Sequence, residues 1–249
     1  MNALPVRASL NAVCSLCRVS NLPTVWMNVL AAAALSGAAW EGSPAAAPAL
    51  LVVLLLVALS CFYCGGMALN DLCDLEHDRM YQRYRPIPAG RITPGRARAV
   101  TLALFASALA CLLLVPHHAG LAAGAMLLFV IWVYDHFHKR HPSTVFAMAG
   151  ARLLVYVVTA SALTGGISTG VGIAALVQGA YVLLLTVVAR HEGRTAAGRY
   201  RWPVIPWMLA AMPLLDGVML AVLVHPAWLL AGVVGMGLTR AGQRYVRGD

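Results

Sequence analysis

Eight stretches of apolar residues, separated by short polar segments, follow one another along the chain. The stretch at 47–69 contains no charged residue. About 20 apolar residues cross a bilayer as a helix, which satisfies its own backbone hydrogen bonds in lipid. The pattern therefore predicts an all-α, polytopic membrane helix bundle of about eight transmembrane helices, the last one short. The predicted spans are residues 19–40, 47–69, 97–115, 119–135, 143–165, 168–189, 203–224 and 226–240.

Composition supports this class of protein. Hydrophobic residues make up 61% of the 249 positions and charged residues 11%, whereas a soluble domain is about half apolar and a quarter charged. No soluble module interrupts the apolar stretches, so we expect a single transmembrane domain over residues 1–249. The first apolar run begins after Arg18 and has full span length without a clear cleavage site, which predicts a retained helix rather than a signal peptide.

The basic residues indicate the orientation of the bundle. They lie before the first span, after the even-numbered spans or at the same ends of the helices, and only Arg152 lies deeper. The loops on the opposite side contain none, which is the positive-inside pattern. We expect an integral protein of a bacterial-type inner (plasma) membrane with both termini cytoplasmic, its net charge of +9 attracted to anionic lipid. Without a basic soluble module, nucleic acid is not an expected partner.

The cysteines and histidines give weaker signals. Two CxxC pairs, at 14–17 and 61–64, have the spacing of a zinc site, but the second pair lies inside an uncharged span. The pattern favours cysteines as small packing residues. The histidines at 136–141 lack the HxxxH and HxxHH spacings of a di-iron enzyme, and we expect them to lie at a solvated loop end.

The stretch NDLCDLEHDRMYQRYRPIPAGR, residues 70–91, concentrates the acidic residues. The chain has nine, and four of them lie here. If the helix of the second span continues, Asn70, Asp71, Asp74 and Asp78 share one face. Because such carboxylates repel one another, they need a cation, and Mg²⁺ binds carboxylate and phosphate oxygens together. We predict that Asp71, Asp74 and Asp78 bind Mg²⁺; the alternative is a solvated helix end whose acids pair with nearby arginines.

The segment RPIPAG, residues 85–90, predicts a rigid proline turn directly after the acidic residues. This turn would place Arg83, Arg85 and Arg91 over an anion that the metal holds. The two features together predict a diphosphate site at the inner face of the membrane.

Two ionisable residues lie inside predicted spans. Arg152 lies roughly 12–15 Å into the fifth span, at ~1.5 Å per residue. A charge at such depth is a functional candidate, and the alternative is a structural pair with Asp135. Asp216, in the seventh span, is expected to be a hydrogen-bonded packing group. Four aromatic residues are candidates to line an apolar pocket and stabilise a carbocation: Tyr63, Trp132, Tyr134 and Tyr156.

These motifs resemble those of a known family. NDxxDxxxD followed by RPIPxG is similar to the first signature of the UbiA superfamily of intramembrane prenyltransferases. Arg18-x-x-Asn21, the Tyr and Lys of TyrAspHisPheHisLys (134–139), and MAGARLLVYVVTASA (148–162) resemble its first, fourth and fifth helices. The resemblance covers roughly residues 15–195, and within the superfamily the chain looks most like the UbiA-like EboC branch.

The resemblance implies an enzyme, a transferase of alkyl groups other than methyl. It would use Mg²⁺ to transfer a prenyl group from an isoprenyl diphosphate to an unidentified small acceptor at the cytoplasmic face. The expected catalytic residues are Asp71, Asp74, Lys139, Arg190 and Glu192, with Lys139 and Arg190 neutralising the diphosphate and Glu192 taking a proton. The expected substrate-binding residues are Asn21, Asn70, Arg85, Tyr134, Arg152 and Tyr156.

The chain departs from the superfamily in two respects. Members commonly have nine spans and a second acidic motif, DxxxD, after the sixth helix. Here that position reads AlaArgHisGluGlyArg (189–194), with Glu192 as its only acid. Our hypothesis is that Arg190 supplies part of the charge of a second Mg²⁺. The alternative is a catalytically degenerate protein that binds or transports an isoprenoid or secondary metabolite. A CDP-alcohol phosphotransferase is disfavoured because its DG-x-x-AR motif is absent.

Overall fold

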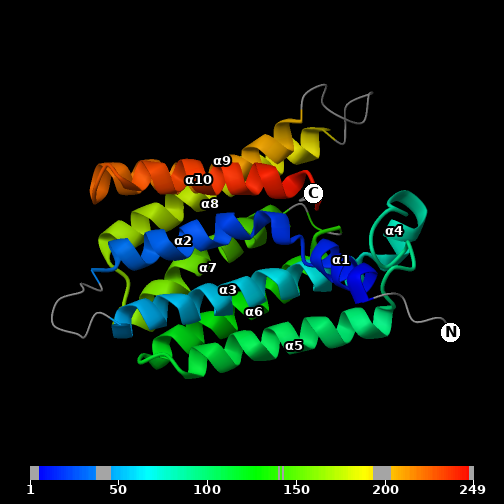
Figure 1. Ribbon diagram of the computed structural model, residues 1–249, viewed down its shortest axis with the longest axis horizontal. Helices are drawn as coiled ribbons and strands as arrows, with labels where there is room; N and C mark the ends of the chain where they lie inside the picture. The colour runs from blue at the N-terminus through cyan, green and yellow to red at the C-terminus, as the bar shows by residue number, and fades with distance from the viewer. Residues whose placement is uncertain (1–5, 38–45, 140, 142, 193–202, 247–249) are drawn as a thin grey trace.

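The computed structural model describes residues 6–37, 46–139, 141, 143–192 and 203–246. All regular structure in these residues is helical (Figure 1). The elements are α1 (Val6–Leu16), the 3₁₀ helix η1 (Val19–Asn21), α2 (Leu22–Leu35), α3 (Ala46–Cys73), α4 (Leu75–Tyr81), α5 (Pro94–Leu113), α6 (His118–Phe137), α7 (Thr144–Thr164), α8 (Thr169–Glu192), α9 (Val204–Leu223) and α10 (Trp228–Gln243).

The all-α membrane bundle predicted from the sequence is confirmed, and each predicted span corresponds to one helix. Six helices are long and apolar enough to cross a membrane: α3 and α5 to α9. Helices α2 and α10 have 14 and 16 residues and are shorter than a full span. Length and composition thus make the chain an integral membrane protein; α2 is shorter than the span predicted at 19–40, and α10 is short, as predicted.

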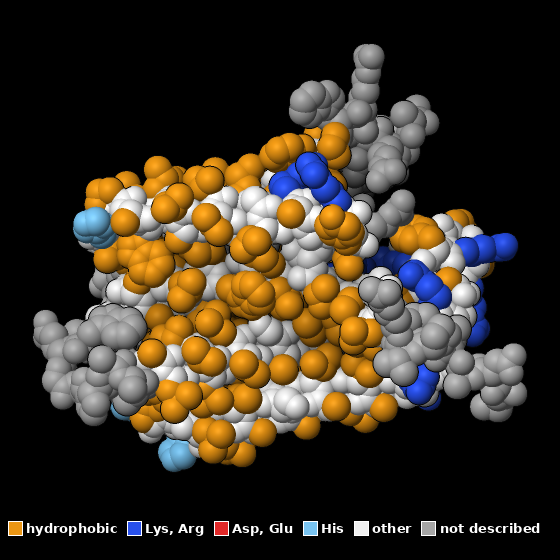
Figure 2. Space-filling model, in the orientation of Figure 1, with side chains coloured by type: hydrophobic (Ala, Val, Ile, Leu, Met, Phe, Trp, Pro, Cys, Tyr) orange, Lys and Arg blue, Asp and Glu red, His pale blue; other side chains and the backbone are white. Residues whose placement is uncertain are grey.

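The surface of the bundle separates apolar flanks from a charged end. Large apolar side chains such as Leu102, Leu176 and Val222 are exposed along the helices, as lipid contact requires. On the face in Figure 2, Lys and Arg side chains gather over the half of the molecule that carries α1 and α4. This one-sided distribution agrees with the sequence pattern of basic residues.

Helix α2 is short, but it lies at the centre of the bundle. It contacts α3, α7, α9 and α10, and Val25 and Val29 belong to the main hydrophobic cluster with residues of α3, α5, α6 and α7. A second cluster joins α2 to α7, α8 and α9. Because so many helices meet α2, polar residues on it can contact polar residues from both halves of the chain.

Two short helices lie at the charged end (Figure 1): α1, which the sequence analysis did not predict, and α4, which continues the acidic helical stretch after a break at Asp74. Ala12 and Leu16 of α1 pack in a third cluster with Ile87 and Ile92, which flank the tight turn before α5. Both isoleucines are buried, and Gly90 adopts a left-handed φ of 70° that the turn needs and a β-carbon would strain. This packing fixes the proline turn against α1 and α3.

Candidate functional site

The acidic residues lie where α3 gives way to α4. The helical hydrogen bonding continues through this point: Asp74 N donates to Asn70 O, and Asp78 N donates to Asp74 O, both at 2.9 Å. Asp71, Asp74 and Asp78 are 2%, 7% and 0% exposed. The predicted continuation of the helix is therefore confirmed, and the three carboxylates are buried rather than solvated.

Arg85, from the proline turn, holds two of these carboxylates together. Its Nη1 lies 3.1 Å from Asp71 Oδ1 and 2.9 Å from Asp78 Oδ2. Burial raises the pKa of Asp78 above its ordinary value, and the charge of Arg85 opposes this shift. One cationic atom thus lies between two carboxylates that would otherwise repel each other.

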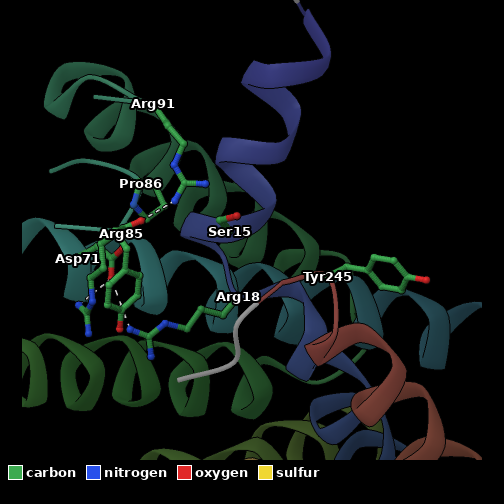
Figure 3. A pocket seen from close by; sticks show the side chains of 8 residues that line it. Ser15, Arg18, Asp71, Arg85, Pro86, Arg91 and Tyr245 are labelled. Atoms are coloured by element: carbon green, nitrogen blue, oxygen red, sulfur yellow. Dashed lines mark hydrogen bonds and ion pairs between the residues drawn. The ribbon is translucent and has the colours of Figure 1, made fainter. Parts of the chain in front are cut away.

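A cavity of about 320 Å³ opens beside Asp71 (Figure 3). Arg18 extends into it from the end of α1, with Nη2 3.5 Å from Asp71 Oδ1. Arg18 has a left-handed φ of 45°, which is uncommon for a residue other than glycine and typical of functional positions. The residues lining the cavity are Ser15, Arg18, Asp71, Tyr84, Arg85, Pro86, Arg91 and Tyr245.

The two other arginines predicted to cover an anion have different positions. Arg91 lines the cavity, where its Nη2 donates to Tyr84 O at 2.7 Å. Arg83 is exposed, and its Nε donates to Arg79 O at 3.1 Å. Of the turn's arginines, Arg85 and Arg91 are therefore at the site, and Arg83 folds back onto α4.

Asp74 has a different set of partners, from the C-terminal end of α6. Lys139 Nζ lies 2.7 Å from Asp74 Oδ1, and His138 Nε2 lies 3.3 Å from Asp74 Oδ2. Burial would raise the pKa of Asp74, but these two hydrogen bonds outweigh it and lower that pKa. The same contact raises the pKa of His138. The predicted Lys139 thus meets the acidic residues, together with a histidine that we expected at a solvated loop end.

Asp135 of α6 adds a fourth buried carboxylate. Its Oδ1 accepts a hydrogen bond from Asn70 Nδ2 at 3.2 Å, and the residue is 5% exposed. Two carboxylate oxygens in this region are buried without a hydrogen-bond partner, Asp78 Oδ1 and Asp135 Oδ2. We call Asp71, Asp74, Asp78 and Asp135 the carboxylate cluster.

Tyr134 lies next to the carboxylate cluster, directly before Asp135 in the sequence. The Tyr134 ring stacks on His138 at 5.1 Å between centroids, and Arg18, Asp74 and Arg190 are all within electrostatic reach of its hydroxyl. Arg190, in the last turn of α8, is therefore near Tyr134, and its contact with a diphosphate stays a prediction. Glu192 ends α8, and its side chain lies outside the described residues.

A second polar group lies deeper in the bundle. Arg152 Nη1 donates to Asn28 Oδ1 at 2.8 Å and Nη2 to Thr24 Oγ1 at 2.9 Å, so Arg152 is anchored on α2 rather than paired with Asp135. Asn28 Nδ2 donates to Asp216 Oδ2 at 2.6 Å, and the Tyr156 hydroxyl donates to Asp216 Oδ1.

We call Thr24, Asn28, Arg152, Tyr156 and Asp216 the deep network. Tyr156 and Asp216 are fully buried, so the structure places the predicted substrate-binding Tyr156 in the core. It also confirms the expected packing role of Asp216, because both carboxylate oxygens are bound within the network.

Tyr63 of α3 lies between the two polar groups. It hydrogen-bonds to Asn21 and is within electrostatic reach of both Arg18 and Arg152. Asn21 Oδ1 also accepts a hydrogen bond from Gln243 of α10 at 3.4 Å. The predicted Asn21 therefore joins the start of α2 to α3 and α10, between the cluster and the deep network.

A protein-family model matches most of this chain. The model of the UbiA prenyltransferase family matches residues 25–248. The chain belongs to the UbiA prenyltransferase family. The EboC-like placement within it stays a prediction.

Several archaeal relatives of this UbiA-family chain carry the same name, digeranylgeranylglyceryl phosphate synthase. The relative from Natronomonas pharaonis is 29% identical over 180 residues, covering 69% of this chain and 63% of its own length. The one from Methanoculleus marisnigri is 30% identical over 162 residues, covering 61% of this chain and 56% of its own. The chain thus aligns with less than two thirds of the length of these relatives.

Solved UbiA-type structures share the fold. A digeranylgeranylglyceryl phosphate synthase structure superposes with a TM-score of 0.62 and 16% identity, covering 96% of this chain and 95% of that one. A UbiA homologue from Archaeoglobus fulgidus bound to GPP and Mg²⁺ gives 0.59 and 18% identity, over 91% and 86% of the two chains. At these identities the likeness establishes the fold.

The donor atoms of the carboxylate cluster fit Mg²⁺. Carboxylate oxygens are the ligands this ion prefers, and Asp78 Oδ1 and Asp135 Oδ2 are buried with no other partner. Arg85 Nη1 shows that two carboxylates converge on a cationic atom. However, no three His, Cys, Asp or Glu side chains of the described residues converge as metal ligands in this arrangement. The predicted ligands therefore lie in one buried region and contact basic side chains, without the convergence of three ligands on one point.

Sequence reasoning missed three residues of the site: Arg18 as an ion-pair partner, His138 and Asp135. A signal existed for two of them, because Asp135, His138 and Lys139 have the i, i+3, i+4 spacing that places side chains on one helix face. Arg18 had none, since its contact with Asp71 depends on how α1 packs against α3. The CxxC pairs form no metal site among the described residues, and every cysteine there is free.

Proposed function

We propose that this chain is a Mg²⁺-dependent prenyltransferase that moves a prenyl group from an isoprenyl diphosphate to a small acceptor at the cytoplasmic face of the membrane. The observation that carries the proposal is the buried carboxylate cluster at the basic end of a membrane bundle, surrounded by Arg18, Arg85 and Lys139. The A. fulgidus homologue that binds GPP and Mg²⁺ supports it through the shared fold.

In this proposal Asp71, Asp74 and Asp78 hold the ion. Bound Mg²⁺ would neutralise the diphosphate and favour its departure. Lys139 is 39% exposed at its side chain, so it can turn from Asp74 toward an incoming diphosphate oxygen. Arg18 and Arg190 add permanent positive charge beside Tyr134. These cations stabilise the charge that builds on the leaving group.

In this proposal the prenyl group reacts on the side of the carboxylate cluster that faces the helix bundle. As the carbon–oxygen bond breaks, positive charge develops on the allylic carbon, and the ring of Tyr134 offers an electron-rich face. The acceptor forms the new bond to this carbon and loses a proton. Glu192 is our candidate to receive that proton. Arg152, held by Asn28 and Thr24, is a candidate to orient the acceptor.

The absence of DxxxD at 189–194 leads to a more specific proposal. Arg190 supplies in protein form part of the positive charge that a second ion would bring, because a guanidinium is permanently charged and binds phosphate through two donors. Bound Mg²⁺ per molecule of a non-hydrolysable diphosphate analogue is the direct measurement. One ion per analogue supports this role of Arg190, and two ions contradict it.

The test of the proposed function does not require the acceptor. Purified protein is incubated with geranylgeranyl or farnesyl diphosphate and Mg²⁺, and diphosphate release is compared between wild type and Asp71→Ala. We expect Mg²⁺-dependent release that Asp71→Ala suppresses. Binding of the substrate without any turnover, across a panel of acceptors, would instead support a non-catalytic binding or transport protein.

A further inference from the structure

Asp135 is the member of the carboxylate cluster for which the structure shows no cationic contact. Asp71 and Asp78 contact Arg85, and Asp74 contacts Lys139. Within the described residues, the Asp135 carboxylate accepts one hydrogen bond, from the neutral amide of Asn70, and its Oδ2 has no partner. Its proximity to the metal-binding stretch is a tertiary contact between α6 and α3.

Burial makes this arrangement costly without a further ligand. An ionised carboxylate removed from water loses several kcal/mol of solvation unless a charge or hydrogen bonds replace it. Native proteins leave few buried polar groups unpaired, and a bound ion is one of the recurring explanations. Asp216 in the deep network shows the contrast, because both of its oxygens are bound by neighbouring side chains.

The position of Asp135 connects it to the proposed metal ligands. It shares a face of α6 with His138 and Lys139, and both of these contact Asp74. Asp135 is also within electrostatic reach of Asp74 itself. Asn70 directly precedes Asp71 on α3, so its hydrogen bond ties one oxygen of Asp135 to the acidic stretch, and the other oxygen has no hydrogen-bond partner.

We propose that Asp135 is a further oxygen ligand of the divalent cation bound at this site. The cluster then draws its carboxylates from α6 as well as from the end of α3 and α4, and Asn70 is the positioning residue that orients the Asp135 carboxylate. The proposal builds on the proposed function only in assigning the cation to the diphosphate site. The proposal thus adds a carboxylate from α6 to the site of a chain whose second motif position, residues 189–194, contains Glu192 as its only acidic residue.

Metal affinity in the absence of substrate tests this proposal. Mn²⁺ replaces Mg²⁺ as the probe, and its binding to the purified full chain is followed by electron paramagnetic resonance. We expect Asp135→Asn to weaken Mn²⁺ binding about tenfold or more, as loss of groups at metal sites does. Asp135→Glu, which retains the carboxylate, should recover part of the affinity. Asp216→Asn is the matched control for loss of a buried acid elsewhere and should leave it unchanged.

Thermal unfolding shows whether the variant is folded, so that a folding defect is not mistaken for a loss of metal binding. Without metal, Asp135→Asn should unfold no earlier than wild type, because the change removes an unpaired buried carboxylate. With Mn²⁺, the stabilisation seen in wild type should shrink in this variant. Equal Mn²⁺ affinity in wild type and Asp135→Asn, or no Mn²⁺ binding by wild type, would overturn the proposal.

The prenyltransferase function and the metal-binding role of Asp135 can be disproved separately. A protein that needs Asp135 for Mn²⁺ binding but never releases diphosphate keeps this inference and loses the prenyltransferase proposal. A protein that turns over with Mn²⁺ affinity insensitive to Asp135 keeps the function and loses the inference.

Discussion

The carboxylate cluster and the deep network use the same kinds of side chain in opposite ways. In the deep network, Asp216 is fully buried, and Tyr156 and Asn28 donate to its two oxygens. In the cluster, Asp78 and Asp135 are also buried, yet each keeps one oxygen without a partner. A fully satisfied polar network rigidifies a core, whereas a partly satisfied one retains capacity for a ligand.

The deep network and the carboxylate cluster also differ in the elements that supply their side chains. The deep network is built from residues of α2 and of α7 and α9, which both pack against α2 in the bundle. The cluster receives Arg85 from a turn, Arg18 from the end of α1, and Lys139 from the end of α6. Side chains at helix ends and turns can exchange partners with little disturbance of the helices. We therefore assign stability mainly to the deep network and chemistry mainly to the cluster, and the predictions below separate the two.

The largest effect is expected from removing a carboxylate of the cluster. Asp74→Ala should lower diphosphate release about 1,000-fold, roughly 4 kcal/mol, because a proposed metal ligand and the partner of Lys139 are lost together. Steady-state release from geranylgeranyl diphosphate with Mg²⁺ measures it. Glu76→Ala is the matched control, since Glu76 is an exposed acid in the same stretch. Equal losses in the two variants would remove the distinction between cluster and surface acids.

The second effect concerns stability and should arise from the deep network. Asp216→Ala leaves the Tyr156 hydroxyl without its acceptor and removes one of the two acceptors of the Asn28 amide, which keeps the Tyr156 oxygen. We expect a loss of about 3 kcal/mol, which lowers the thermal midpoint by roughly 6–12 °C. Differential scanning fluorimetry in detergent measures it, with Asp216→Asn as the milder change. A midpoint for Asp216→Ala within 2 °C of wild type, at the measurement error, would contradict the structural role of this network.

Local sequence patterns were sufficient to predict the helices and the helix face that carries the acidic residues. Apolar length predicted the bundle, and the spacing of Asn70, Asp74 and Asp78 predicted their shared helical end, because both depend on neighbours along the chain. Arg18 reaches the cluster through packing of α1 against α3, which no local pattern encodes; the spacing of Asp135 with Lys139 indicates their shared helix face, but not the packing of α6 against α3. The same holds for Asn28, whose partners Arg152 and Asp216 come from α7 and α9.

The length of α2 shows another limit of the sequence pattern. The apolar run at 19–40 predicted a full span, but the α-helix begins at Leu22 and ends at Leu35. Val19–Asn21 form a 3₁₀ turn after the left-handed Arg18, and this turn redirects the chain from α1 into the bundle. Two of the three residues of this turn, Ser20 and Asn21, are polar and yet buried, so hydrophobicity could predict neither their burial nor the turn that follows Arg18.

The smallest effect is a pH-dependent one at the edge of the cluster. Asp74 raises the pKa of His138, so the stabilisation from protonated His138 is complete below its unfolded pKa of about 6.5. It is lost as pH rises through the higher folded pKa. In metal-free buffer, the loss of stability in His138→Gln should therefore be about 1 kcal/mol larger at pH 6 than at about pH 9, where only pH-independent contacts such as the ring stack on Tyr134 still separate the two proteins. Thermal midpoints across this range measure it, with the exposed His136→Gln as control. A difference that stays constant or grows with pH would show that His138 does not pair with Asp74 as an imidazolium, and would leave Lys139 as that carboxylate's main cationic partner.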